Sequence, residues 1–245
     1  MNRYFVDLHV HTALSPCAAE EMTPPAIVRL ACELGLHVLA ICDHNSAGNV
    51  RAVQGAAGDR LTVLAGIEIT TAEEVHVLGI FPDADRADRV ARGILQTLPA
   101  PLDSPRSFGP QLLLDESGQV VGAEPHLLTW ACGFDLTQTV YIIKEHGGLA
   151  IASHIDRPSF SVFSQLGIFP REAGFDAVEV TPAGLSSPDA GRYTALNLPI
   201  ITASDSHDLA TLGMVYSMFE IQSPTFEEVT RALKGEGNRK VYYRA

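Results

Sequence analysis

The stretch that decides the fold is residues 4–42, which read YFVDLHVHTALSPCAAEEMTPPAIVRLACELGLHVLAIC. The apolar run Tyr4–Leu8 predicts a strand, and Thr23 followed by Pro24 predicts the start of a helix. A helical apolar stripe then covers Ala26–Leu34 up to a glycine, and His37–Cys42 predicts the next strand. A strand, a helix and a second strand in this order indicate a βαβ unit, and hence a parallel sheet.

The same alternation continues along the chain. Further strands are predicted at Leu61–Ile69, Val75–Phe81, Leu149–Ser153, Ala177–Val180, Pro199–Ala203, Ser217–Ile221 and Lys240–Tyr243. Further helices are predicted at Asn45–Ala57, Asp83–Leu98, Leu127–Ala131, Leu136–His146, Pro188–Leu196 and Thr225–Lys234. About seven βα units predict that the sheet closes into one α/β barrel domain spanning residues 1–245. Residues 82–137, with a Pro-rich loop at 99–110 and a hairpin at 111–121, are predicted to be an insertion between barrel strands that covers the site as a lid.

Composition narrows the classes of function. The chain has 245 residues, of which 46% are apolar, and a formal charge of −12. Proteins that grip long nucleic acids usually present a basic face, so a long nucleic acid is a disfavoured partner and a small anionic substrate fits better. The four cysteines form no CxxC pair, and no apolar run approaches the ~20 residues that span a bilayer. We therefore expect a cytoplasmic protein with no membrane partner, whose oligomeric state the sequence does not specify.

The first predicted strand carries the motif Asp7-Leu8-His9-Val10-His11. Side chains alternate along a strand, so positions 7, 9 and 11 project to one face. Two imidazoles with this spacing can bind one metal ion, and the Asp7 carboxylate can accept the second ring N–H of a ligand. Taken alone, the motif is equally compatible with a pair of surface histidines.

Histidines and acidic residues recur at the ends of other predicted strands. They are Asp43, His44, Glu68, His76, His154, Asp205 and His207. The C-terminal ends of barrel strands meet at one end of the barrel, where the active sites of such folds lie. Imidazoles mixed with carboxylates, without a thiolate cluster, suit Zn, Mn or Fe in a hydrolytic centre. The pattern therefore predicts a multinuclear metal site and a metal-dependent hydrolase.

Four separated motifs of this chain resemble the PHP (polymerase and histidinol phosphatase) domain family, and they occur in the family's order. They are residues 7–12 (DLHVHT), 42–45 (CDHN), 66–68 (GIE) and 203–207 (ASDSH). The resemblance implies a distorted TIM-like (β/α)7 barrel that holds two or three divalent transition-metal ions. Most active members of the family act on phosphoesters, which implies the same chemistry here.

The resemblance also implies how the ligands are divided among the ions. The first set is His9, His11, Glu68 and Asp205; the second is Glu68, His76 and His154, with Glu68 bridging the two ions; the third is His44, His207 and an acidic residue of the loop after His11.

The acidic ligand of the third ion is the point at which the chain departs from the family's pattern. Many relatives have Ser-Asp-Gly shortly after the first motif, whereas residues 15–24 here read SPCAAEEMTP. Glu21 is the replacement that we predict, and Glu20 and Cys17 are the alternatives.

Arg157 follows His154 by three positions. In the family an arginine shortly after this histidine meets the substrate phosphate, which implies that Arg157 binds the substrate and takes part in catalysis. A guanidinium group offers a pair of N–H donors that match phosphate oxygens. The alternative role for Arg157 is a surface salt bridge to Asp156 or Glu179.

The implied mechanism needs no nucleophile from the protein. Two ions bridged by Glu68 would lower the pKa of a shared water and present a metal-bridging hydroxide to phosphorus. The ions and Arg157 would stabilise the charge that grows on the phosphoryl oxygens. Asp205 or His207 would assist proton transfer.

The sequence thus predicts a phosphoesterase, specifically a phosphatase, that hydrolyses a small phosphorylated metabolite or nucleotide. An exonuclease or oligonucleotide phosphodiesterase acting on short DNA or RNA is the alternative, which the net charge and the lack of an aromatic and basic track disfavour. Amidohydrolases and TatD-like nucleases also begin with His-x-His, but they lack the Asp43-His44 motif at this position. A non-catalytic scaffold would have lost ligands, whereas this set is complete apart from the loop residue.

Overall fold

The computed structural model describes residues 1–101 and 109–243. Within them, the strands are β1 (Asn2–Val10), β2 (Val38–Ile41), β3 (Thr62–Thr70), β4 (His76–Phe81), β5 (Leu112–Leu114), β6 (Val120–Ala123), β7 (Leu149–Ala152), β8 (Ala177–Glu179), β9 (Ile200–Ile201), β10 (Ser217–Ile221) and β11 (Lys240–Tyr243). The α-helices are α1 (Pro24–Glu33), α2 (Val50–Ala57), α3 (Ala84–Leu95), α4 (Leu136–Glu145), α5 (Val162–Leu166), α6 (Pro182–Leu185), α7 (Ala190–Thr194) and α8 (Phe226–Leu233). None of these helices is long and apolar enough to cross a bilayer.

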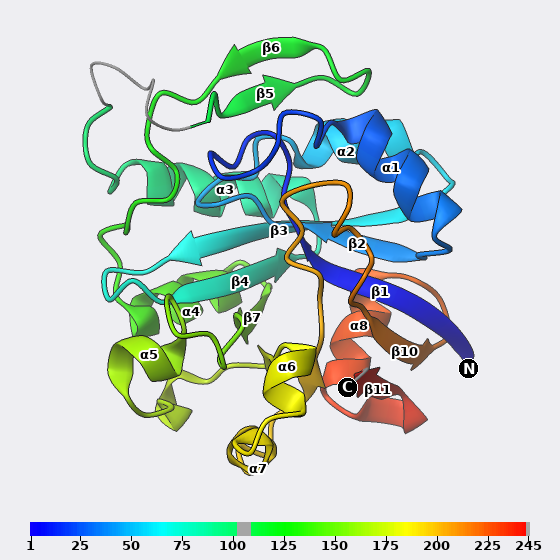
Figure 1. The fold of residues 1–245 in the computed structure, drawn as a ribbon, viewed down its shortest axis with the longest axis vertical. Helices are drawn as coiled ribbons and strands as arrows, with labels where there is room; N and C mark the ends of the chain where they lie inside the picture. The colour runs from blue at the N-terminus through cyan, green and yellow to red at the C-terminus, as the bar shows by residue number, and fades with distance from the viewer. Residues whose placement is uncertain (102–108, 244–245) are drawn as a thin grey trace.

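Nine of these strands form one curved sheet (Figure 1). Its order is β11-β10-β1-β2-β3-β4-β7-β8-β9, and the two edge strands, β9 and β11, come into contact. The sheet is therefore a nearly closed barrel, and the predicted TIM-like α/β barrel with its distortion is confirmed. β5 and β6 pair only with each other, as the hairpin predicted at 111–121 requires.

The sheet is mixed, whereas the repeated βα units of the sequence indicated a parallel sheet. Residues 71–75 alone connect β3 to β4, and a link this short joins neighbouring strands only in an antiparallel pair. β4 also pairs antiparallel with β7, and β10 pairs antiparallel with β1. As a result β1, β2, β3, β7, β8 and β9 share one direction. Their carboxyl ends lie at one end of the barrel, together with the amino end of β4.

Apolar residues pack on both faces of the sheet. Alternate residues of β2 divide between two buried clusters: Leu39 and Ile41 belong to one, and Val38 and Ala40 belong to the other. The first cluster also contains buried residues of α1, α2, α3 and α4, so these helices cover one face. The second contains residues of α8, which packs on the opposite face. Strands buried on both faces carry near-continuous apolar runs, which is why β2 was predictable from sequence.

The segment 82–137 contains both a barrel helix and the hairpin. Helix α3 packs against β3 and β4 and adds Ala87, Val90 and Ile94 to the core. The β5–β6 hairpin lies beyond α1 and α2 (Figure 1), and both the amide and the carbonyl oxygen of the Asn49 side chain bind its backbone, at Leu112 and Leu114. In the predicted Pro-rich loop, residues 102–108 lie outside the described residues. The lid function of this segment stays a prediction.

The helix predicted at Leu127–Ala131 does not form. The Asn45 side chain donates to the carbonyl oxygens of Leu128 (2.7 Å) and Trp130 (2.8 Å) and accepts from the amide of Thr70 (3.1 Å). The segment therefore has backbone partners outside itself, which compete with the bonds of a helix. Asn45 also has a left-handed backbone (φ 49°), and the predicted helix at 45–57 accordingly begins only at Val50.

We expect Asn45→Ala to lower the free energy of unfolding by about 2–4 kcal/mol, because buried partners lose their hydrogen bonds. The matched control is Asn197→Ala, since Asn197 is exposed and has a similar φ of 56°. That control loses only the tolerance of asparagine for the left-handed region, about 1 kcal/mol. Urea unfolding of both variants measures the difference. Equal losses in the two variants would show that the Asn45 hydrogen bonds do not hold the segment 128–130.

Candidate metal centre

Eight predicted ligands meet at the end of the barrel where the carboxyl ends of the parallel strands lie. His9 and Glu68 belong to β1 and β3, His76 opens β4, and the others follow β1, β2, β7 and β9: His11, His44, His154, Asp205 and His207. Backbone hydrogen bonds bring these segments together, because the amide of His11 donates to Ser206 (3.0 Å) and the amide of Asn45 donates to Glu68 (2.8 Å). His76 reaches the same end because its strand runs in the opposite direction.

Glu68 is the centre of this cluster. Its carboxylate oxygens lie within 3.4 Å of a ring nitrogen of five histidines: His76 (2.9 Å), His44 (3.1 Å), His154 (3.2 Å), His9 (3.3 Å) and His11 (3.4 Å). The residue is 1% exposed. A carboxylate surrounded in this way can bridge two cations, because each of its oxygens faces a different set of imidazoles.

The first predicted ligand set is brought together completely. The Nε2 atoms of His9 and His11 lie 3.1 Å apart, and Asp205 Oδ1 lies 3.2 and 3.1 Å from them. With Glu68 they form a group whose ligand atoms all lie within 4.8 Å of one another. Such a spacing is compatible with one ion at the middle of the group.

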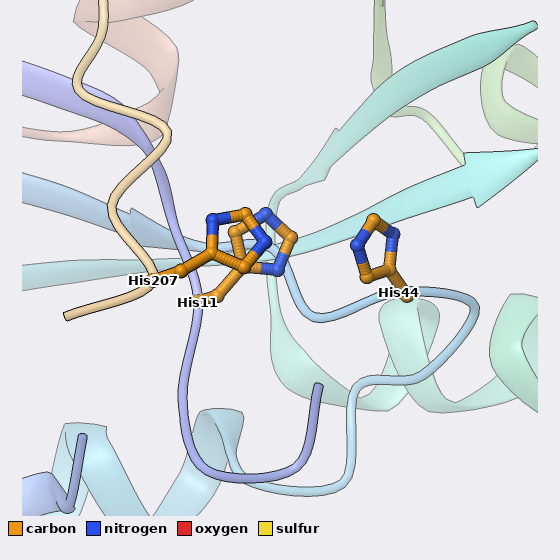
Figure 2. A group of neighbouring side chains, drawn as sticks. All are labelled: His11, His44 and His207. Atoms are coloured by element: carbon orange, nitrogen blue, oxygen red, sulfur yellow. The ribbon is translucent and has the colours of Figure 1, made fainter. Parts of the chain in front are cut away.

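Two further groups of possible ligands overlap with the first. His44, Glu68 and His76 form one, and His154 adjoins it through its contact with Glu68. The other is His11, His44 and His207, three rings that come from the ends of β1, β2 and β9 (Figure 2). The rings of His11 and His207 are stacked at 4.0 Å between centroids.

The structure does not bring Glu21 into the cluster. Glu21 is exposed, and none of the three groups contains it, Glu20 or Cys17. The buried position in this part of the loop belongs to Met22, whose carbonyl oxygen accepts from the amide of Ala13 (3.0 Å). The neighbouring Glu21 consequently points to solvent, and its predicted role as the third ion's ligand gains no support.

Burial and charge prepare the cluster for cations. Burial disfavours the charged form of Glu68, but the neighbouring imidazoles, that of His76 foremost, outweigh it and hold the pKa of this carboxyl well below its ordinary value. Burial, reinforced by the charge of His207, lowers the pKa of His11 to about 3. At neutral pH Glu68 is therefore a carboxylate and His11 a neutral imidazole, which are the forms that bind metal ions.

The geometry of the described residues fits divalent metal ions. The buried Nδ1 atoms of His44 and His76 lie near Glu68 but make no hydrogen bond with it or with any other described residue. Burial disfavours a charged His9, yet Asp205, Glu68 and Glu179 outweigh it and hold the pKa of His9 well above its ordinary value. A cation among these atoms would satisfy nitrogen and oxygen alike, and mixed imidazole and carboxylate sets suit Zn, Mn and Fe.

Two hydrogen bonds orient the rings of the first motif. Glu179 Oε2 accepts from His9 Nδ1 (2.9 Å), and Ser15 Oγ lies 2.9 Å from His11 Nδ1. Ser15 in turn donates to Asp43 (2.7 Å), so it accepts the N–H of His11. Both rings thereby direct Nε2 at the cluster. The carboxylate that accepts the second ring N–H of His9 is that of Glu179, although the sequence predicted Asp7 for this role. In the sequence, Glu179 was marked only by its position at the end of a predicted strand.

A cavity of about 140 Å³ opens onto the cluster. Its lining consists of His44, Glu68, His76, His154, Arg157, Ser159, Phe160, Asp205 and His207. Arg157 Nη1 donates to Asp205 Oδ2, and 40% of the Arg157 side chain is exposed. The predicted substrate-binding arginine therefore lies at the site, and its partner is Asp205 instead of Asp156 or Glu179.

Comparison with known families agrees with this geometry. The family model of the PHP domain matches residues 7–133, just over half of the chain. The chain belongs to the PHP family. A second model, described as PHP-associated, matches residues 191–236. Together the two matched segments of this PHP protein contain every residue of the three ligand groups, and His154 lies between the segments.

Solved structures share the fold at low sequence identity. The lesion-specific endonuclease Q of Pyrococcus furiosus is 19% identical, with a TM-score of 0.77 over 98% of this chain and 58% of its own. A proposed metal-dependent phosphoesterase of Bifidobacterium adolescentis is 20% identical, with a TM-score of 0.59 over 91% of this chain and 93% of its own.

A similar sequence is that of an uncharacterised Bacillus subtilis protein, YqxK. It is 36% identical over 107 residues, which are 40% of this chain and 27% of that protein.

We expect Glu179→Gln to weaken metal binding about 10-fold or more. Glutamine has nearly the same shape as glutamate, but its neutral amide makes the His9 ring less basic and therefore a poorer ligand. Competition with a chromogenic chelator measures the dissociation constant of Zn²⁺ or Mn²⁺. The matched control is Glu172→Gln, since Glu172 is exposed and outside the cluster. If both variants bind metal as tightly as the wild type, Glu179 does not support the centre.

Proposed function

We propose that this chain is a metal-dependent phosphoesterase that hydrolyses a small phosphorylated metabolite or nucleotide. One observation carries the proposal: Glu68 with five imidazoles, the second carboxylate Asp205 and the guanidinium of Arg157 all line one cavity or adjoin it. Carboxylates and imidazoles attract cations, and a guanidinium attracts an anion. A site that gathers both is suited to an anionic ester bound to metal ions.

The proposed centre holds two or three divalent ions. Glu68 would bridge the first two: one with His9, His11 and Asp205, and the other with His76 and His154. His44 and His207 would hold a third ion, with the remaining ligand unassigned. Bound ions would supply the Lewis acid that polarises the phosphoryl group and activates the attacking water.

The residues of the chain then have distinct tasks. Arg157 contacts Asp205 through one nitrogen, so its other N–H donors can bind phosphoryl oxygens at the cavity. His207 is 27% exposed on its side chain, more than the other ligands, and its Nδ1 lies 2.9 Å from the Asp205 carbonyl oxygen. That leaves its Nε2 as the atom that would bind the third ion or, in a centre of two ions, exchange a proton with the leaving group.

The solved structures bear on the substrate in two ways. The Bifidobacterium protein is described as a metal-dependent phosphoesterase, whereas endonuclease Q is a lesion-specific endonuclease whose substrate is a duplex with an abasic lesion. Both are under 25% identical to this chain, so they support the fold and leave the substrate to experiment. The net charge of −12 favours a small substrate.

We expect purified wild-type protein to contain bound divalent metal and to hydrolyse phosphate monoesters after loading with Mn, Zn or Fe. His9→Ala removes a proposed ligand of the first ion and should lower kcat/KM on the order of 100-fold or more, beyond the roughly 10–100-fold loss typical when a residue that only orients a ligand is changed. Elemental analysis and a screen of phosphorylated metabolites, nucleotides and short oligonucleotides measure both effects.

The matched control is His146→Ala, because the His146 ring bonds to the Ile142 carbonyl oxygen and stands outside the metal-ligand groups of the described residues. It should keep the metal content and the activity of the wild type. Wild-type protein without metal, or His9→Ala with full activity, would refute the metal-dependent mechanism. Turnover of oligonucleotides alone would replace the proposed substrate class with the phosphodiesterase alternative.

Arg157→Met is expected to lower kcat/KM for a phosphate monoester about 100-fold, the effect of removing one donor to a developing anion. The metal content should stay at the wild-type value, because Arg157 is not a ligand. Arg60→Met is the control, since Arg60 is exposed, follows α2 and donates to the Ala56 carbonyl oxygen at the end of that helix. A proportional loss of metal and activity in Arg157→Met would assign Arg157 a structural role instead.

A further inference from the structure

Phe160 stands at the rim of the metal cavity. Its ring is stacked on that of His76, with centroids 4.6 Å apart and an interplanar angle of 18°. The residue is nevertheless 39% exposed. One face of the ring therefore lies against a metal-ligand candidate, while more than a third of the residue is exposed beside the cavity.

The chain holds Phe160 in this position by several bonds. Its carbonyl oxygen accepts from the amide of His76 (2.9 Å), and Ser161 Oγ donates to the carbonyl oxygen of Arg157 (2.7 Å). Phe160 has a φ of 55°, a left-handed backbone that is costly for a bulky residue. An exposed ring, a strained backbone and a fixed loop at the mouth of one cavity together indicate a binding role.

The cavity is too small to enclose a whole substrate molecule. At about 140 Å³ it is smaller than the roughly 300–1,000 Å³ of pockets that enclose a whole small molecule. It has room for ions and a phosphoryl group, so the rest of the substrate must lie along the rim. There it meets Arg157, Ser159 and Phe160.

We propose that Phe160 is a stacking platform for the base of a nucleoside phosphate whose phosphoryl group enters the cavity. The proposal rests on the proposed phosphoesterase function and names its substrate class. A planar base would extend the stack of His76 and Phe160, and aromatic stacking accepts any base because each has a π-face. The sugar would then cross the rim between Phe160 and the cluster, next to Ser159.

The test compares two probes that differ only in the base, AMP and ribose 5-phosphate. Wild-type protein should prefer AMP in kcat/KM, and Phe160→Ala should reduce the ratio of the two values about tenfold, the usual scale for loss of one base–aromatic stack. Phe160→Tyr should keep the ratio. Phe160→Leu, which retains apolar bulk, should lose it as Phe160→Ala does.

Tyr141→Ala is the matched control, because Tyr141 is an exposed aromatic residue on α4 outside the cavity. It should leave the ratio at the wild-type value. Equal effects of Phe160→Ala on both probes, or a wild type without preference for AMP, would overturn the stacking proposal while phosphoester hydrolysis stands.

Equilibrium binding separates this proposal from the proposed function. If neither probe is hydrolysed, isothermal titration of the metal-loaded protein should still show tighter binding of AMP than of ribose 5-phosphate in the wild type and not in Phe160→Ala. That outcome supports the platform and refutes phosphomonoester hydrolysis. Identical binding of both probes in both proteins refutes the platform.

Discussion

A buried carboxylate is the constraint on which the rest of this structure depends. Glu68 is 1% exposed, and taking such a charge out of water costs several kcal/mol unless donors or cations surround it. Five imidazoles from four segments of the chain fulfil this requirement within 3.4 Å, since His9 and His11 both belong to the end of β1. The rings must reach the same two oxygens of Glu68. The carboxyl ends of β1, β2, β3 and β7 and the amino end of β4 are therefore held at one point.

Strand direction decides whether this meeting is possible. In a barrel of parallel strands alone, the first residue of a strand lies at the end remote from the active site. His76 is such a residue, and it reaches Glu68 because the short turn 71–75 reverses β4. The antiparallel pair is therefore what completes the cluster of candidate ligands. The parallel neighbours supply the remaining candidates from their carboxyl ends.

Local sequence rules were enough for much of the fold and the site, and contacts between distant segments account for the rest. Apolar runs predicted the strands, so His9, Glu68 and Asp205 could be expected at one end of a barrel. The link between Glu179 and His9 joins positions 170 residues apart, which no local pattern reports. For the same reason Asn45, which binds Leu128 and Trp130, abolished a helix that the apolar periodicity favoured. The exposure of Glu21 follows from the burial of the neighbouring Met22, which depends on loop packing that no local pattern reports.

The backbone around the cavity differs between the candidate metal ligands and the loop at the rim. His154, Phe160 and Asp205 have φ values of 26°, 55° and 48°, each costing on the order of 1–3 kcal/mol in a non-glycine residue. Such strain persists only where neighbouring structure dictates it, and His154 and Asp205 closely follow strands of the packed sheet. Phe160 belongs instead to the loop 157–161, which lies outside the sheet and is held by a few side-chain and backbone bonds. The loop nevertheless adjoins the cluster at two points, because Arg157 donates to Asp205 and the Phe160 carbonyl oxygen accepts from the amide of His76.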